Sequence, residues 1–110
     1  MLDTDVKLMI VDDELSIRTS LSQSFSEMGY CVRSAESGRS ALLKIQQGLP
    51  HILISDINMP GMSGLELMSC VRRQFPSIRV IAMSGAFSGN CVPPGVDADA
   101  FYEKGAIPLL

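Results

Sequence analysis

The chain has 110 residues, of which 46% are hydrophobic and 19% are charged. This size and composition indicate one globular domain with a buried core, and they exclude both two independent domains and a disordered tail. The formal net charge of −3 argues against direct nucleic-acid binding, because non-specific affinity for nucleic acid depends on clustered cations.

The first half of the chain predicts two strand–helix units. The apolar run at 8–11 is typical of a strand that is covered on both faces. Apolar residues then recur at helical spacing over 17–28, and Gly29 is placed to end that helix. A shorter apolar run at 30–32 predicts a second strand, after which Ser37 can cap a second helix.

The second half repeats this pattern less regularly. Apolar runs at 52–54 and 80–83 predict strands, and the helix between them begins at a capping box whose first residue is Ser63. Residues 85–95 contain three glycines and two prolines, so an irregular link is expected in place of a fourth helix. A weaker strand follows at 98–102.

This alternation predicts an α/β domain with an open, doubly wound parallel sheet. Residues 107–110 are typical of the first turn of a helix whose remainder is truncated, so we expect the sequence to be a fragment of a longer protein. A truncated last helix would leave an apolar strip on one face of the sheet. We therefore expect self-association, with a homodimer as its simplest form.

Cysteine usage and hydropathy indicate the compartment. Cys31, Cys70 and Cys91 are widely spaced and include no C-x-x-C pair, which predicts reduced thiols. The apolar runs are far shorter than the roughly 20 residues that cross a bilayer, and the polar segment 1–7 does not resemble a signal peptide. We expect a cytoplasmic protein with no membrane partner.

Polar side chains follow the predicted strands at the sheet edge where open α/β folds bind ligands. Asp12 and Asp13 follow the first strand, Asp56 the third, Ser84 the fourth and Lys104 the fifth. Clustered carboxylates repel one another unless a cation lies among them, and oxygen ligands beside a phosphate suit Mg²⁺. With a hydroxyl and an ammonium nearby, this cluster indicates transfer of a phosphoryl group to a carboxylate.

The motifs around these residues are specific. They comprise Val-Asp-Asp-Glu at 11–14, Ser-Asp-Ile-Asn-Met-Pro-Gly-Met-Ser-Gly at 55–64, Ala-Met-Ser-Gly at 82–85, and Lys104. The set covers almost the whole chain and resembles the receiver domain of bacterial two-component response regulators. The resemblance implies one receiver domain over residues 1–110, with a flavodoxin-like, five-stranded sheet of order 2-1-3-4-5.

The resemblance also implies a role for each acidic residue. Asp56 would be the phosphoacceptor. Asp13 and Asp56 would bind Mg²⁺ together with the backbone carbonyl of Asn58, and Asp12 would hold a metal-bound water. The domain would accept a phosphoryl group and switch an output, and it would not be an enzyme in its own right.

By the same resemblance, Ser84 and Lys104 would contact the phosphoryl group, and Ser84 and Phe101 would relay the change. The phosphoryl donor would be a histidine kinase or another phosphohistidine donor, and the output would be an effector domain outside this chain. Lys104 is followed by Gly105 where the family usually has proline. We therefore predict a trans peptide bond there and a lysine displaced from Asp56.

The third acidic residue after the first strand, Glu14, is interpreted differently from Asp12 and Asp13. We expect Glu14 to favour the first-turn dipole of its helix, not to bind metal.

Two other functions use similar features. A docking domain that keeps the fold but is no longer phosphorylated remains open. A phosphatase of the haloacid dehalogenase type uses similar groups, but its nucleophile follows the first strand in a D-x-D pair, whereas Asp56 follows the third strand and has Asn58 two residues on.

Overall fold

The computed structural model describes residues 6–85 and 95–104. Its elements are β1 (Lys7–Val11), α1 (Leu15–Glu27), β2 (Cys31–Ala35), α2 (Gly38–Gln47), β3 (Ile52–Asp56), α3 (Gly64–Gln74), β4 (Arg79–Ser84) and β5 (Ala100–Glu103). All strand pairs are parallel, and the sheet order is β2-β1-β3-β4-β5. The predicted α/β fold and strand order are confirmed.

Local sequence signals set the helix boundaries. The Ser63 side chain accepts a hydrogen bond from the Glu66 backbone N–H, and the Glu66 side chain accepts one from the Ser63 N–H, which completes the predicted capping box. The Ser37 hydroxyl caps α2. Gly29, just beyond α1, has φ of +101°, a conformation that glycine adopts at low cost.

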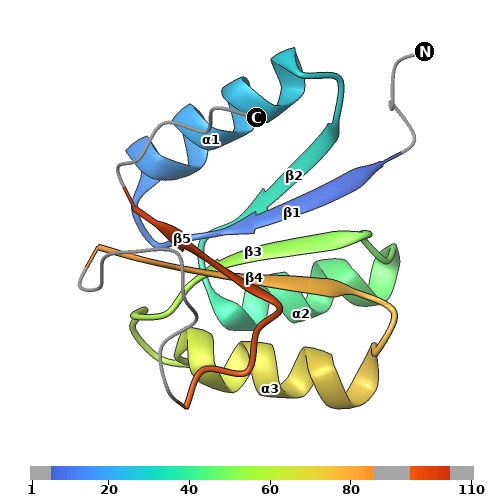
Figure 1. The fold of residues 1–110 in the computed structure, drawn as a ribbon, viewed down its shortest axis with the longest axis vertical. Coiled ribbons are helices and arrows are strands. Elements are labelled where there is room, and N and C mark those ends of the chain that lie inside the picture. Colours follow the sequence, from blue (N-terminus) through green and yellow to red (C-terminus); the bar gives the residue numbers. More distant parts are fainter. Residues whose placement is uncertain (1–5, 86–94, 105–110) are drawn as a thin grey trace.

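The sheet separates two layers of helices, with α1 on one face and α2 and α3 on the other (Figure 1). Leu53, Val80 and Ala82 face α2 and α3, and all three are fully buried. On the opposite side of the same strands, Ile52 and Ile81 pack against the α1 cluster but are only half-buried. The described residues therefore cover the α1 face of the sheet less completely.

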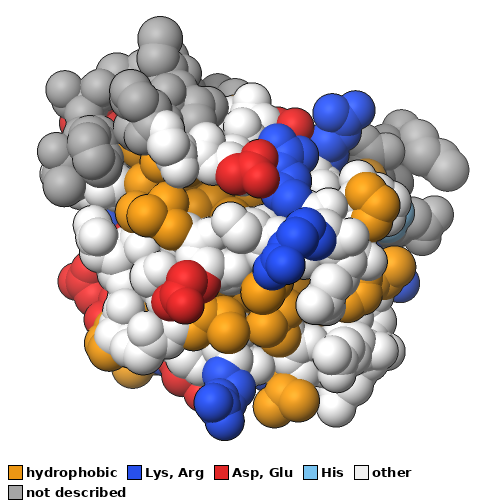
Figure 2. All heavy atoms as spheres, turned by 90° about the horizontal axis from the view of Figure 1, so that it is seen from below, with side chains coloured by type: hydrophobic (Ala, Val, Ile, Leu, Met, Phe, Trp, Pro, Cys, Tyr) orange, Lys and Arg blue, Asp and Glu red, His pale blue; other side chains and the backbone are white. Residues whose placement is uncertain are grey.

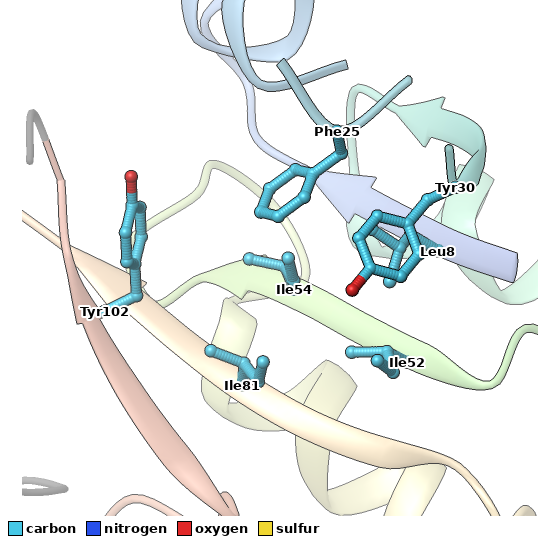
Figure 3. Close-up of a pocket in the computed structure, with 7 residues that line it drawn as sticks. All are labelled: Leu8, Phe25, Tyr30, Ile52, Ile54, Ile81 and Tyr102. Atoms are coloured by element: carbon cyan, nitrogen blue, oxygen red, sulfur yellow. The ribbon is translucent and has the colours of Figure 1, made fainter. Parts of the chain in front are cut away.

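An apolar pocket of about 120 Å³ marks this thinner cover. Its lining side chains extend from the sheet, from α1 and from the turn that follows α1 (Figure 3), and they are Leu8, Phe25, Tyr30, Ile52, Ile54, Ile81 and Tyr102. The pocket lies where the sequence predicted an apolar strip. Self-association through it stays a prediction.

The last strand begins later than the sequence predicted, at Ala100 and not at residue 98. The Asp99 carboxylate accepts a hydrogen bond from the Val80 N–H at 2.8 Å, so a side chain takes the donor that a strand carbonyl would otherwise use. The predicted irregular link falls largely on 86–94, and the truncated helix falls on 107–110. Both lie outside the described residues.

The surface seen from the α3 side mixes acidic, basic and apolar side chains (Figure 2). None of the described helices is long and apolar enough to cross a membrane.

Candidate functional site

Strand pairing brings the predicted carboxylates together at one edge of the sheet. Val11 pairs with Ser55, so the residues that follow them, Asp12 and Asp56, lie next to each other at the strand ends. Oxygen atoms of Asp12, Asp13 and Asp56 all lie within 4.8 Å of one another. Asp12 and Asp56 are buried, whereas Asp13 is exposed. The acidic cluster predicted from the sequence is thus present.

The backbone around Asp56 is tightly packed. The next residue along, Ile57, donates its N–H to the Met83 carbonyl of β4 at 2.9 Å. The N–H of Asn58 donates to Asp56 Oδ1 at 3.4 Å. Gly64 begins α3 directly against this strand end, and a Cβ there would lie 1.8 Å from the Asp56 carbonyl oxygen. Only glycine leaves room for this approach.

Asp12 is oriented by the start of α1. Its Oδ1 accepts the N–H of Glu14 at 2.8 Å, and its backbone carbonyl accepts a hydrogen bond from the Arg18 guanidinium at 2.7 Å. Its Oδ2 is buried and lies 3.1 Å from the Lys104 ammonium. One carboxylate oxygen is therefore held by a backbone N–H, while the other faces the lysine ammonium.

Lys104 lies in the middle of the cluster. Its ammonium is 2.8 Å from Glu14 Oε1, 3.1 Å from Asp12 Oδ2 and 3.3 Å from Asp56 Oδ2. The Lys104 N–H donates to the Ser84 carbonyl at 2.9 Å, which extends the β4–β5 pairing and places the lysine over the acidic cluster. The predicted displacement of Lys104 is therefore wrong, because β-sheet pairing and ion pairs hold the side chain without a following proline. The bond to Gly105 lies outside the described residues.

Ser84 ends β4, the strand next to that of Asp56, and Phe101 lies on β5, the strand after it in the sheet. Ser84 is fully buried at the end of β4, directly after Met83, which pairs with Asp56. Phe101 pairs with Ala82 and is 7% exposed in the core between the sheet and helices α2 and α3. Ser84 is thus at the edge of the sheet where the carboxylates gather, whereas Phe101 is a core residue one strand away.

Burial raises the pKa of Asp12 above its ordinary value, against the opposing effects of the Glu14 N–H and Lys104. Burial also raises the pKa of Asp56, and the charge of Asp12 adds to this rise. Burial alone lowers the pKa of Lys104, but its contacts with Glu14, Asp12 and Asp56 outweigh burial and raise that pKa well above normal. The fold therefore makes ionisation of Asp12 and Asp56 less favourable and keeps Lys104 charged.

The charge balance of the site favours a cation. The four carboxylates of Asp12, Asp13, Glu14 and Asp56 outnumber two nearby cations, the Lys104 ammonium and the Arg18 guanidinium, and leave an excess of two negative charges when all are ionised. The buried Asp12 Oδ2, which the Lys104 ammonium approaches at 3.1 Å, lies in this region. Hard carboxylate oxygens, few in number and partly open to water, are the ligand set that suits Mg²⁺. The residues present fit that ion.

Two contributors to the site were not predicted from the sequence. Glu14 makes no side-chain capping bond to α1 and pairs with Lys104 instead. Arg18 holds the Asp12 carbonyl. A usable signal was that Glu14 follows the acidic pair at the same strand end, and that Arg18 lies one helical turn further along.

Comparison with known proteins gives a consistent result. The family model described as response regulator receiver domain matches residues 8–102. The transcriptional activator protein ExaE of Pseudomonas putida is 37% identical over 107 residues, which cover 94% of this chain and 50% of ExaE. The chain thus spans about half the length of this curated relative.

Solved structures agree with this match. The chemotaxis protein CheY4 of Vibrio cholerae superposes with a TM-score of 0.83 at 32% identity, covering 94% of this chain and 89% of CheY4. The response regulator TrrA of Thermotoga maritima, solved in complex with Mg²⁺ and BeF, gives a TM-score of 0.69 at 37% identity, covering 72% of this chain and 69% of TrrA. The structure of TrrA in complex with the histidine kinase ThkA gives a TM-score of 0.79 at 34% identity, and the match covers 89% of this chain and 84% of the matched chain. The sequence, the sheet order and the acidic site with its lysine all lead to one conclusion: this chain belongs to the response regulator receiver domains of two-component systems.

Proposed function

We propose that this receiver domain accepts a phosphoryl group on Asp56 in a Mg²⁺-dependent reaction and thereby switches an output. The observation that carries the proposal is the position of Asp56. It is a buried carboxylate with a lysine ammonium 3.3 Å from Oδ2, beside two further aspartates that fit a divalent cation. Phosphoryl transfer needs this combination of nucleophile and positive charge.

The chain's own residues would perform the transfer as follows. An Asp56 carboxylate oxygen forms a bond to phosphorus. The bond from phosphorus to the donor breaks, and its electron pair leaves with the imidazole nitrogen of a phosphohistidine or the oxygen of acetate. Lys104 pairs with the phosphoryl oxygens, Ser84 donates its hydroxyl to them, and the Asn58 N–H keeps Asp56 oriented. Mg²⁺, held by Asp13, Asp56 and the Asn58 carbonyl with Asp12 acting through water, would supply charge neutralisation.

The partners follow from the chemistry and from the relatives. A histidine kinase, or another phosphohistidine donor, is the proposed phosphoryl source, a proposal supported by the TrrA–ThkA complex. An effector domain beyond this chain is the proposed output, since ExaE is a transcriptional activator and this chain spans half of it. Ser84 and Phe101 are the proposed relay, because Ser84 ends β4, the strand next to that of Asp56, and Phe101 lies on β5, the strand next to β4.

The direct test is phosphorylation by a small donor. With Mg²⁺ and acetyl phosphate or phosphoramidate, intact mass should show one added phosphoryl group on the wild type. Asp56→Asn should show none, and chelation of Mg²⁺ should abolish the gain. Asp13→Asn should weaken Mg²⁺ binding and slow the gain while keeping the acceptor.

Two other results would overturn the proposal. Steady turnover of phosphomonoesters would identify a phosphatase of the haloacid dehalogenase type. Mg²⁺ binding without any gain in mass, from the small donors and from a phosphorylated kinase alike, would identify a docking domain that is no longer phosphorylated.

A further inference from the structure

The shortest contact of the Lys104 ammonium is with Glu14, at 2.8 Å. Glu14 is the N-cap residue of α1, yet its side chain makes no capping hydrogen bond. Its side chain is 58% exposed, whereas those of the other two partners of Lys104, Asp12 and Asp56, are 0% and 4% exposed. Glu14 is therefore a carboxylate at the mouth of the site whose side chain does not cap the helix.

The three acidic partners of the Lys104 ammonium among the described residues differ in what else they can bind. Asp12 and Asp56 belong, with Asp13, to the carboxylate group whose oxygens lie within 4.8 Å of one another, and Glu14 is not part of that group. A divalent cation in the group would draw on the oxygens of Asp12 and Asp56 and would repel the ammonium. Glu14 would then be the one of the three partners that remains available to Lys104.

Lys104 needs such an anchor. A lysine side chain has four flexible carbon–carbon bonds and a strongly hydrated ammonium, so it orders poorly without a fixed partner. In the sequence it is followed by Gly105, which puts little restriction on the backbone. An ion pair in which Lys104 is only 14% exposed is screened less by water than an ordinary surface pair.

We propose that Glu14 is a positioning residue that holds the Lys104 ammonium at the mouth of the site while a divalent cation occupies the Asp12, Asp13 and Asp56 group. Lys104 then meets the incoming phosphoryl oxygens from a fixed position. The inference rests on the proposed function, because it assigns a role within the same reaction.

The first experiment compares Glu14→Gln with Glu36→Gln under saturating Mg²⁺ and acetyl phosphate. Glu36 is a matched control, since it is exposed and directly follows Ala35, which pairs with Val11 at the same sheet edge. Loss of either negative charge favours approach of an anionic donor. Glu14→Gln should nonetheless slow phosphorylation about tenfold or more, whereas Glu36→Gln should leave it unchanged or slightly faster.

A double-mutant cycle tests whether Glu14 acts through Lys104. In a Lys104→Met background, Glu14→Gln should cause no further loss of rate, because the group that it positions is gone. Equal losses in both backgrounds would show that Glu14 acts independently of the lysine and would overturn the inference.

The chemical reactivity of Lys104 tests the contact with Glu14 without relying on phosphorylation. Reductive methylation of Lys104 by formaldehyde and a borohydride reagent, measured by peptide mass spectrometry at saturating Mg²⁺, should be slow in the wild type and several-fold faster in Glu14→Gln. The exposed Lys7 serves as an internal reference. Equal Lys104 reactivity in the two proteins would refute the anchoring.

The outcomes separate this inference from the proposed function. If the wild type gains no phosphoryl group, the proposed function fails. If the wild type is phosphorylated but Glu14→Gln behaves like Glu36→Gln in rate and in Lys104 reactivity, only the positioning role of Glu14 fails.

Discussion

Gly64 links the start of a helix to the reactive carboxylate. A Cβ at this position would lie 1.8 Å from the Asp56 carbonyl oxygen and 2.8 Å from Ile57 Cα, so any side chain must push the strand end away. Asp56 is also where burial and the charge of Asp12 act against ionisation. At the scale of single residues, the site therefore combines a steric limit at Gly64 with an unfavourable environment for the Asp56 charge.

We expect Gly64→Ala to lower the free energy of unfolding by about 1–3 kcal/mol through overpacking and to slow phosphorylation, because Asp56 must shift. Urea unfolding and intact mass measure the two effects. Gly48→Ala is the control, since its new Cβ would meet nothing closer than 3.8 Å and should change stability by no more than about 0.5 kcal/mol. Equal effects of the two substitutions would contradict the steric interpretation.

Asp56→Asn should stabilise the protein without Mg²⁺ at pH 7, by about 1 kcal/mol. A raised pKa means that the folded state holds its proton more tightly than the unfolded state. Stability therefore falls as pH rises from the unfolded pKa to the higher folded pKa, and the penalty persists at neutral pH. Urea unfolding in a chelator should show the gain at pH 7 and a smaller gain at pH 4. Destabilisation at pH 7 would instead mean that the pair with Lys104 dominates.

At the scale of elements, one arginine ties the last strand to the rest of the domain. Arg72 of α3 forms ion pairs of 3.1 Å with Asp97 and with Asp99, just before β5. Asp99 also accepts the N–H of Val80, so it connects α3, β4 and the entry to β5. This hydrogen bond lowers the pKa of Asp99, and the charge of Arg72 lowers it further against the opposing effect of burial.

Asp99→Ala should lower the free energy of unfolding at pH 7 by no more than about 1 kcal/mol, since the side chain is about a third exposed and partly screened. A lowered folded pKa stabilises above the unfolded pKa, and the effect disappears as pH falls through the folded value. The difference from wild type should therefore shrink below pH 4 in urea titrations. Asp97→Ala leaves the hydrogen bond between Asp99 and Val80 intact, so it should lower the free energy of unfolding by less than Asp99→Ala at pH 7. The reverse ranking would assign the stability to the ion pairs alone.

At the scale of the whole molecule, the two faces of the sheet are covered unequally. Helices α2 and α3 bury one face, while α1 alone packs on the other face among the described elements (Figure 1). The apolar pocket that results lies between α1 and β5 (Figure 3). Tyr30, Ile52, Ile81 and Tyr102, which line the pocket, are half-buried, so their apolar side chains are partly accessible to a second copy of the chain.

We therefore predict that this chain self-associates, with a weight-average mass in sedimentation that rises with concentration. Tyr102→Glu should reduce the association, because it places a charge in the pocket. Leu65→Glu on α3 is the matched control, since Leu65 is an exposed apolar residue away from that pocket and its change should have no effect. A monomer at high concentration that binds no hydrophobic dye would refute the prediction.

The sequence by itself determined the order of the elements, the caps at Ser37 and Ser63, and the clustering of Asp12, Asp13 and Asp56. Periodicity and capping are local, and parallel strands necessarily bring their carboxyl ends to one edge. These features needed no knowledge of which side chains meet across the fold.

Only the tertiary structure decided where Lys104 points, where β5 begins and how fully the α1 face is covered. Glu14 and Lys104 are 90 positions apart in the sequence, and the absence of proline after Lys104 suggested displacement because local geometry was the only guide. Ion pairs and strand pairing between distant segments outweighed that local signal. Contacts of this kind depend on the packed positions of whole elements, so no pattern within one segment encodes them.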